Sequence, residues 1–352
     1  MNYFSIVWPV IIFSFLFFSF LFKEKYFKYV LFSIIFLFSL MVSLRGKQSL
    51  GDTGYYIDIF VNSVDIDYIF EGRMAWKGDY FFGFFIYLIR KFSDNYHLFF
   101  FICSLFFLSL LVYSVNKLQL NKVSNRQSFI FISVFMVSYV PFLMYGNTIR
   151  QGAAISLSYL ALYFLGKNRL FIYFVLAFLA VFTHKSAVIL IPFLVFHCLP
   201  GKLKLLSLVL IVFLTVLAVG LLGGILNFVG GKAEFYEHNF HSKIDVILII
   251  SFFCLFVLVF YKNFIKSILG EIDVLSDFFY FMIFLAIGFI SLEKIAARYL
   301  LYIMPILPYF LCLSIISIRQ KELILNLFFV LVVFFSFLMM LAPQVQNIMV
   351  WS

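Results

Sequence analysis

Residues 98–115 read LFFFICSLFFLSLLVYSV, an uncharged run of the length that a bilayer-spanning helix needs. Short charged stretches separate this run from eleven others of similar character, at residues 4–22, 29–44, 128–145, 150–165, 170–183, 186–199, 205–222, 244–261, 278–292, 299–317 and 323–341. The pattern predicts an all-α polytopic membrane protein, a bundle of about twelve transmembrane helices. Residues 80–92 form a shorter apolar run, for which we expect an interfacial or re-entrant helix.

The composition excludes a soluble globular protein. Of 352 residues, 65% are hydrophobic and 12% are charged, whereas an ordinary soluble domain has roughly 25% charged residues. The two longest charged stretches, 45–80 and 223–243, are too short for a domain of their own. We therefore expect one integral membrane domain over residues 1–352, with these two stretches as outer loops that contribute to or cover the active site. Glycine pairs at Gly223-Gly224 and Gly230-Gly231 predict hinges in the second loop.

The distribution of charge between alternate loops predicts the orientation of the helices. If both termini lie outside, the inner loops hold 14 of the 26 Lys and Arg residues and 5 of the 16 acidic residues. The balance is then +9 inside and +1 outside, as expected when cytoplasmic loops are enriched in basic residues. The outer loops carry mixed charge beside apolar segments, so we expect the active site on the outer face. The net charge of +10 does not indicate nucleic-acid binding, because the chain has no block of basic residues.

The first outer motif follows the second apolar run. It reads RGKQSLGDTGYY from Arg45 to Tyr56, and two glycines bracket Asp52. This spacing predicts a tight turn in which Asp52 and Thr53 cap a following helix. Arg45 and Asp52 are candidate site residues, and the alternatives are a snorkelling anchor for Arg45 and a simple N-cap for Asp52.

The second outer motif reads YGNTIRQGAA from Tyr145 to Ala154, where one apolar run ends and the next begins. Arg150 and Gln151 fall in the first turn of the second helix. A cation at a helix N-terminus opposes the helix dipole, so this placement is unfavourable unless an anion binds there. The alternative is that Arg150 only anchors the helix end.

The third outer motif is Thr183-His184-Lys185-Ser186-Ala187, between two short apolar runs. A histidine titrates near neutrality, so His184 can take a proton from a hydroxyl group. The charge of Lys185 favours the neutral imidazole, and Ser186 is placed to cap the next helix. A hydrogen-bonded histidine at the membrane interface is the alternative.

The fourth outer motif is Glu293-Lys294-Ile295-Ala296-Ala297-Arg298. Lys294 and Arg298 share one helix face at a spacing where like charges repel, unless an anion lies between them. Charges so close to an apolar run are candidate functional groups. A diphosphate would satisfy Lys294, Arg298 and Arg150 together through charge-assisted hydrogen bonds.

No metal or other cofactor is expected from the sequence. Four cysteines lie in apolar runs without a CxxC pair, and we interpret them as small core residues: Cys103, Cys198, Cys254 and Cys312. His238 and His241 lack a complete set of ligands at ordinary metal-site spacing.

In their order along the chain, the motifs GDTGYY from Gly51, IRQGAAIS from Ile149 and THKSA from Thr183 resemble the EpsG family, which contains Wzy-like bacterial polysaccharide polymerases. The resemblance implies a GT-C-like architecture in the bacterial inner membrane. It implies a glycosyltransferase that joins undecaprenyl-diphosphate-linked oligosaccharide repeat units on the periplasmic or outer face. The product would be an O-antigen, a capsule or an exopolysaccharide. The implied partners are this lipid-linked substrate and membrane lipid, and a chain-length regulator is a further candidate.

On this hypothesis Arg150, Lys294 and Arg298 bind the diphosphate, and Arg45 and Lys185 are further cationic candidates. Gln151 and Glu293 lie beside these cations and are candidate substrate-binding residues. Either His184 or Asp52 would be the base that deprotonates the acceptor hydroxyl, and the sequence does not decide between them. Attack opposite the leaving diphosphate would invert the anomeric carbon. A flippase for lipid-linked oligosaccharides and an O-antigen ligase are the competing functions.

Overall fold

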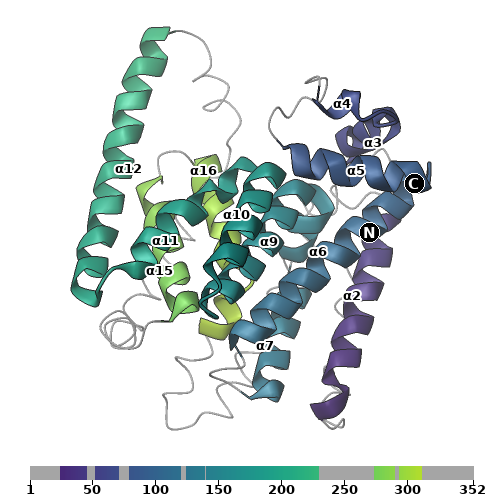
Figure 1. Cartoon of the computed structure of the whole chain (residues 1–352), viewed down its shortest axis with the longest axis horizontal. Helices are drawn as coiled ribbons and strands as arrows, with labels where there is room; N and C mark the ends of the chain where they lie inside the picture. Colours follow the sequence, from purple (N-terminus) through teal and green to yellow (C-terminus); the bar gives the residue numbers. More distant parts are fainter. Residues whose placement is uncertain are drawn as a thin grey trace, which may run out of the picture. The chain divides into compact units, whose positions relative to one another are not determined.

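The computed structural model describes residues 24–45, 52–70, 79–119, 124–138, 140–229, 273–289 and 293–310, and this part of the chain is built of helices joined by turns (Figure 1). The chain divides into two compact units. The first contains the described residues up to Val188 and those from Pro305 onward, and the second runs from Ile189 to Met304.

The first unit contains most of the helices. In chain order they are η1 (Glu24–Tyr26), α2 (Phe27–Ser43), α3 (Thr53–Asn62), α4 (Asp67–Phe70), α5 (Tyr80–Phe92), α6 (Tyr96–Gln119), α7 (Asn125–Val137), α8 (Val140–Phe142), the π-helical turn η2 (Leu143–Asn147), α9 (Ile149–Leu165) and α10 (Leu170–Thr183). A 3₁₀ turn, η3 (Lys185–Ile189), leads to the second unit. The predicted bounds of α5 and α10 agree with the structure, and those of α2, α6 and α9 agree within a few residues.

Helix α9 forms the centre of the first unit. It packs against α6 and α10, and α6 also packs against α2. Small residues in α9, including Gly152, Ala153, Ala154 and Ser156, are buried, so the neighbouring helices surround it. A helix that is buried on nearly all sides belongs to the interior of a bundle.

Two described helices are long and apolar enough to cross a bilayer, namely Glu24–Ser43 and Tyr96–Gln119. A bent pair, Asn125–Met136 with Val140–Asn147, would add a third. Shorter apolar helices lie at Leu170–Thr183, Lys185–Cys198, Leu203–Leu217 and Val274–Gly288. The chain is therefore a helical membrane protein, and the count of twelve spans stays a prediction. The predicted spans 4–22, 244–261 and 323–341 lie outside the described residues.

Two predicted helices are broken, and each break lies beside a proline. The run 128–145 bends by 62° between α7 and the helix that begins at Val140. Pro141 lacks the backbone N–H that would donate to the Val137 carbonyl oxygen in a continuous helix, so one of the bonds across this point cannot form. The run 299–317 is likewise interrupted, because α16 ends at Ile303 and a turn covers Met304, Pro305 and Ile306. The prediction of one continuous helix is wrong in both places.

The second unit contains α11 (Leu190–Cys198), α12 (Gly201–Val229), α15 (Val274–Gly288) and α16 (Glu293–Ile303). Helix α15 packs against the other three. Helix α12 continues through Gly223 and Gly224, so the predicted hinge there is wrong. Glycine is tolerated inside helices of membrane proteins, and the apolar residues that follow this pair extend the helix. Residues 230–243, with Gly230-Gly231, lie outside the described part.

A buried polar cluster joins three helices of the second unit. The Asp277 carboxylate oxygen Oδ2 lies 2.5 Å from Lys204 Nζ and 2.6 Å from His197 Nδ1. Lys204 and Asp277 are both buried. Both are among the charges that the count of basic and acidic residues assigned to inner loops, and the structure pairs them inside the protein. A buried charge requires such a partner, so this cluster ties α12 and α11 to α15.

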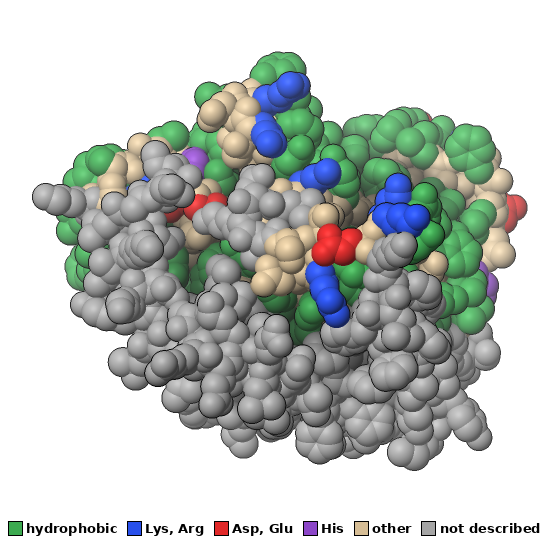
Figure 2. Space-filling model, turned by 90° about the horizontal axis from the view of Figure 1, so that it is seen from below, with side chains coloured by type: hydrophobic (Ala, Val, Ile, Leu, Met, Phe, Trp, Pro, Cys, Tyr) green, Lys and Arg blue, Asp and Glu red, His purple; other side chains and the backbone are tan. Residues whose placement is uncertain are grey.

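Basic side chains lie at one end of the first unit. Lys25 and Lys28 at the start of α2 and Lys117 near the end of α6 are exposed at one end, and Figure 2 shows Lys and Arg side chains on the face seen from below. Helices α3, α4 and α5 lie at the opposite end of α2 and α6 (Figure 1). His97 Nδ1, in the first turn of α6, lies 2.5 Å from the Ser43 carbonyl oxygen at that same end.

Candidate active site

Three motifs that are far apart in the sequence meet at the α3–α5 end of the first unit. The Asp52 backbone N–H donates to Asn147 Oδ1 at 3.0 Å, which joins the first motif to the second. The Arg150 backbone N–H points at the Tyr56 hydroxyl oxygen, 3.4 Å away. The rings of Tyr80 and Phe182 lie 6.1 Å apart and join α5 to the end of α10, beside the third motif. We call the residues of these three motifs, together with Asp79, Tyr80 and Phe182, the outer-end cluster, after the outer face on which the motifs were predicted to lie.

An ion pair lies inside the cluster. Arg150 Nη1 binds Asp79 Oδ2, and the two side chains are only 15% and 5% exposed. Arg150 lies in the first turn of α9, as predicted, and Asp79 is the N-cap residue of α5. The predicted anion for Arg150 is thus present, but the protein itself supplies it.

Burial raises the pKa of the Asp79 carboxyl above its ordinary value of 3.8. The charges of Arg150 and Lys185 oppose this effect and lower the pKa, but burial is the larger cause. A carboxylate whose pKa is raised toward neutrality binds a proton more readily than an exposed one. The cluster therefore contains a candidate base that the sequence analysis did not single out.

Asp79 was missed because its partner lies 71 residues further along the chain. The local signal was an aspartate directly before the apolar run 80–92, in the N-cap position that Asp residues favour. Its side chain makes no capping hydrogen bond, however, and pairs with Arg150 instead. Tyr56 and Asn147 were also missed, although both lie within predicted motifs.

Arg45 is held rigidly at the end of α2. Its Nε donates to the Val42 carbonyl oxygen at 2.9 Å and its Nη1 to Thr53 Oγ1 at 3.0 Å. The guanidinium lies 4.8 Å from the centre of the Phe100 ring, in cation–π geometry. Burial lowers the pKa of Arg45 to about 9, so its charge is retained at neutral pH.

One nitrogen of Arg45, Nη2, is buried and has no hydrogen-bond partner among the residues that the structure describes. A side chain at Gly146 would begin 3.6 Å from Nη1, so the second motif lies in van der Waals contact with the guanidinium. Arg45 is therefore not a snorkelling anchor, because it is 3% exposed and its bonds hold the start of α3.

Asp52 and Tyr56 lie on the first turns of α3. Asp52 is the N-cap residue, as predicted, but the predicted capping bond from its side chain is absent. Asp52 is exposed, whereas Tyr56 is buried. Burial raises the pKa of the Tyr56 hydroxyl to about 12, against the opposing effect of Arg150. Tyr56 is therefore neutral near pH 7, and its oxygen accepts from the Arg150 backbone.

His184 lies in the turn after α10. The Ser186 backbone N–H donates to His184 Nδ1 at 3.2 Å, and Ser186 Oγ lies 2.7 Å from the same nitrogen. Because the backbone N–H can only donate, this geometry favours the tautomer that carries its proton on Nε2. Such a ring donates a hydrogen bond through Nε2. Ser186 does not cap α11 as predicted, since that helix has Ile189 as its N-cap.

The remaining candidates are divided between the two units. Gln151 is buried beside Arg150 in the chain, and Lys185 is exposed next to His184. Glu293, Lys294 and Arg298 lie on α16 in the second unit, as predicted for a helix. Arg298 is exposed, and the side chains of Glu293 and Lys294 lie outside what the structure describes.

Within the described residues, no group of three or more His, Cys, Asp or Glu side chains could hold a metal ion. His238 and His241 lie outside this part of the chain. Cys103 is buried, but Cys198 is exposed at the end of α11, so the prediction of a core role is wrong for Cys198.

The model of the EpsG family matches residues 28–350, which is nearly the whole chain. The chain belongs to the EpsG family. EpsG-like proteins resemble polysaccharide polymerases, which gives the chain a place in polysaccharide biosynthesis. No curated protein and no solved structure matches the chain.

Proposed function

We propose that this EpsG-family chain is a polymerase of the bacterial inner membrane that joins undecaprenyl-diphosphate-linked oligosaccharide repeat units into a surface polysaccharide. An O-antigen is the first product to test, and the reaction would take place on the periplasmic face. The observation that carries the proposal is the Asp79–Arg150 pair, beside Lys185, at the end of an apolar helical bundle. This arrangement offers a base and two cations for a phosphate group at one end of the bundle.

In the proposed reaction the donor is a glycan whose anomeric carbon is bonded to the lipid diphosphate. The acceptor is a sugar hydroxyl of the next lipid-linked unit. The hydroxyl oxygen bonds to the anomeric carbon while the bond from that carbon to the diphosphate oxygen breaks. The hydroxyl proton passes to a carboxylate, and the diphosphate leaves with the electron pair. Attack from the opposite side inverts the anomeric carbon.

Asp79 suits the role of base better than the two residues favoured by sequence reasoning. Asp52 is exposed to solvent, outside the buried part of the cluster. His184 has its Nδ1 occupied by Ser186, which leaves Nε2 as a donor. Asp79 is buried, and its pKa is raised. We therefore assign proton removal to Asp79 and hydrogen bonding to the substrate to His184 and Asp52.

An exchange of partners at Arg150 would couple substrate binding to proton removal by Asp79. When the diphosphate arrives, Arg150 and Lys185 bind its oxygens through charge-assisted hydrogen bonds. Arg150 then neutralises Asp79 less, so the pKa of Asp79 rises further and proton uptake becomes easier. Gln151 lies beside Arg150 as a further substrate contact. Lys294, Arg298 and Glu293 lie in the second unit, and their role in substrate binding stays a prediction.

Arg45 acts differently in this proposal. Its contacts to Val42, Thr53 and Phe100 fix it within the protein. We assign it the positioning of α3, and with it Asp52 and Tyr56, rather than the transfer of a proton.

The test is the glycan of a strain that lacks this protein and carries one variant at a time. Loss of a polymerase leaves a single repeat unit on lipid A core, loss of a ligase leaves none, and loss of a flippase traps the units on the inner side. We expect Asp79→Asn and Arg150→Ala to give the single-unit pattern at normal membrane levels. Long chains in both variants would show that the proposed site is wrong.

A further inference from the structure

A row of aromatic side chains leads from the outer-end cluster along α10. Tyr80, the residue after Asp79, has its ring 5.9 Å from Phe70 and 6.1 Å from Phe182. The Phe182 ring lies 4.3 Å from that of Phe178, one turn earlier on α10. Phe174 follows one turn further, and the spacing of four residues keeps all three phenylalanines on one face of the helix.

Most of this row is exposed, and Phe182 is half-buried. Phe178 is 60% exposed, and Phe174 and Tyr80 are also exposed. Helix α10 is one of the apolar helices of the chain, so this face lies where lipid can contact it. Its far end at Phe174 is two helical turns from Phe182, which is about 12 Å at 1.5 Å per residue. At its near end are Asp79, Arg150 and Lys185.

The charges at the near end distinguish this face from an ordinary lipid-facing surface. A ligand that fits both parts has a long apolar chain and an anionic headgroup. A lipid diphosphate has this chemistry, because its phosphate oxygens suit Arg150 and Lys185 and its chain can follow the rings. An isoprenoid chain carries flat double bonds at regular intervals, and these pack well against aromatic faces.

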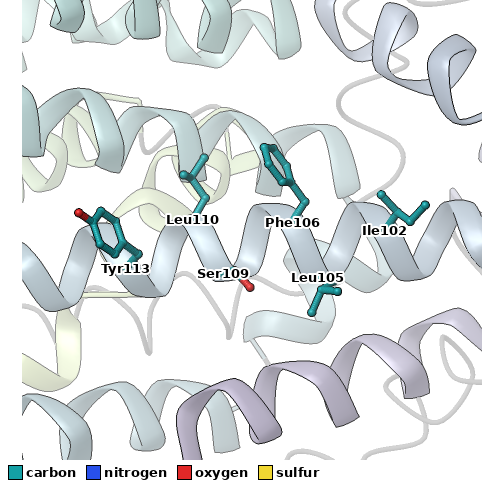
Figure 3. Close-up of a pocket in the computed structure, with 6 residues that line it drawn as sticks. All are labelled: Ile102, Leu105, Phe106, Ser109, Leu110 and Tyr113. Carbon is teal, nitrogen blue, oxygen red and sulfur yellow. The ribbon is translucent and has the colours of Figure 1, made fainter. Parts of the chain in front are cut away.

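A second apolar surface, on α6, does not fit such a ligand. A hollow of about 520 Å³ on α6 is lined by Ile102, Leu105, Phe106, Ser109, Leu110 and Tyr113 (Figure 3). At about 100° per residue, Ile102 and Ser109 lie on the face of α6 opposite Phe100. Phe100 is the residue against which Arg45 packs. The hollow therefore faces away from this part of the cluster, and no cation in its lining could hold a headgroup.

We propose that Tyr80, Phe182, Phe178 and Phe174 form a track for the polyprenyl chain of the lipid carrier, with its diphosphate at Lys185 and Arg150. This inference rests on the proposed function and adds the place of the carrier chain. In a bilayer the track gains little from the hydrophobic effect, because the surrounding acyl chains are equally apolar. Its preference for the carrier must come from the headgroup, which holds the chain at a high effective concentration beside the rings.

Site-specific photo-crosslinking tests the track. The photoreactive residue p-benzoyl-phenylalanine replaces Phe178 in the full-length protein, reconstituted in phospholipid vesicles that contain undecaprenyl diphosphate. The matched control is Phe32 on α2, which is 57% exposed and also lies on an apolar helix. Adducts are identified by their mass, so a polyprenyl adduct is distinguished from a phospholipid adduct.

We expect about tenfold more polyprenyl adduct at position 178 than at position 32, which corresponds to about 1.4 kcal/mol of preference. Lys185→Gln should reduce the adduct at 178 severalfold, since Lys185 is exposed and its loss disturbs no packing. Position 174 provides a second site if the change at 178 impairs folding. Equal polyprenyl adducts at 178 and 32, or only phospholipid adducts at 178, would overturn the track.

The crosslinking test and the test of the proposed function can fail separately. Crosslinking reports contact with the carrier, whereas the glycan pattern reports polymerisation. If the crosslinks appear at 178 but the deletion strain still makes long chains, the polymerase assignment fails. If chain growth depends on Asp79 but the crosslinks are absent, the track fails and the active site stands.

Discussion

At the scale of single residues, the proposed chemistry of the outer-end cluster depends on the ion pair of Asp79 with Arg150. The pair is almost fully buried, and the Tyr56 hydroxyl, through the Arg150 backbone, and the charge of Lys185 both act on it. If either charge is removed, the other stays buried without an opposite charge, and the free energy of unfolding falls. A substitution here therefore needs readouts of both folding and activity.

Asp79→Asn should lower the polymerisation rate by about 10²- to 10⁴-fold, the usual contribution of a positioned base. The amide keeps the size of the side chain but cannot accept the hydroxyl proton. The rate is measured with lipid-linked repeat units in membranes that contain equal amounts of protein. Asp65→Asn is the control, because Asp65 is an exposed acid in the turn between α3 and α4. Equal loss in both variants would point to a general effect of charge rather than to a base.

The polymerisation rate should also fall at acidic pH, with a midpoint above pH 3.8. Burial raises the pKa of Asp79, and only its carboxylate form can accept the proton of the hydroxyl. Lys185 lowers this pKa, so Lys185→Gln should move the midpoint to higher pH. A raised pKa means that protonation of Asp79 favours the folded state, so this group stabilises the protein as the pH falls. The unfolding temperature, measured at each pH, distinguishes a loss of catalysis from a change in stability. A midpoint that stays in place in Lys185→Gln would contradict the assignment.

At the scale of elements, the approach of η2 to α9 fixes the second motif. A Cβ atom at Gly152 would lie 2.5 Å from the Met144 carbonyl oxygen, which is backbone and cannot turn away. Gly152→Ala should therefore destabilise the protein by about 1–3 kcal/mol and displace Arg150. Gly146→Ala is the matched control, since its nearest atoms would be 3.6 Å and 3.9 Å away. The measurement is the temperature at which each purified variant loses its monodisperse peak. A Gly152→Ala protein as stable as Gly146→Ala would refute this account.

The elements also show what the sequence could predict. Apolar runs bounded by charges located α5 and α10, because hydropathy follows from composition within a few turns of chain. Hydropathy did not predict the bend after Val137, although Pro141 was a usable signal. It also did not predict that α12 extends past Gly223. The Asp79–Arg150 pair and the buried Lys204–Asp277 pair were beyond reach, since their partners are 71 and 73 residues apart. Such contacts depend on how helices pack, which no local pattern contains.

At the scale of the whole molecule, the orientation in the membrane decides which compartment supplies the substrate. The positive-inside pattern predicts that the α3–α5 end faces outward and that the ends bearing Lys25, Lys28 and Lys117 face the cytoplasm. The structure agrees with one part of this prediction, because the outer motifs of the first unit meet at one end and these lysines lie at the other. An outward active site requires that its substrate has already crossed the membrane, so the enzyme would act after a flippase.

Cysteine labelling in intact cells tests this orientation. In a chain whose four native cysteines are replaced, Asp65→Cys places a thiol in the exposed turn between α3 and α4, and Asn125→Cys places one at the exposed start of α7. Replacement of Cys198 is essential, because it is exposed and would react. A membrane-impermeant maleimide should label position 65 in intact cells, and position 125 only after the cells are permeabilised. The reverse pattern would put the Asp79–Arg150 pair on the cytoplasmic side, and a polymerase using translocated repeat units could not work there.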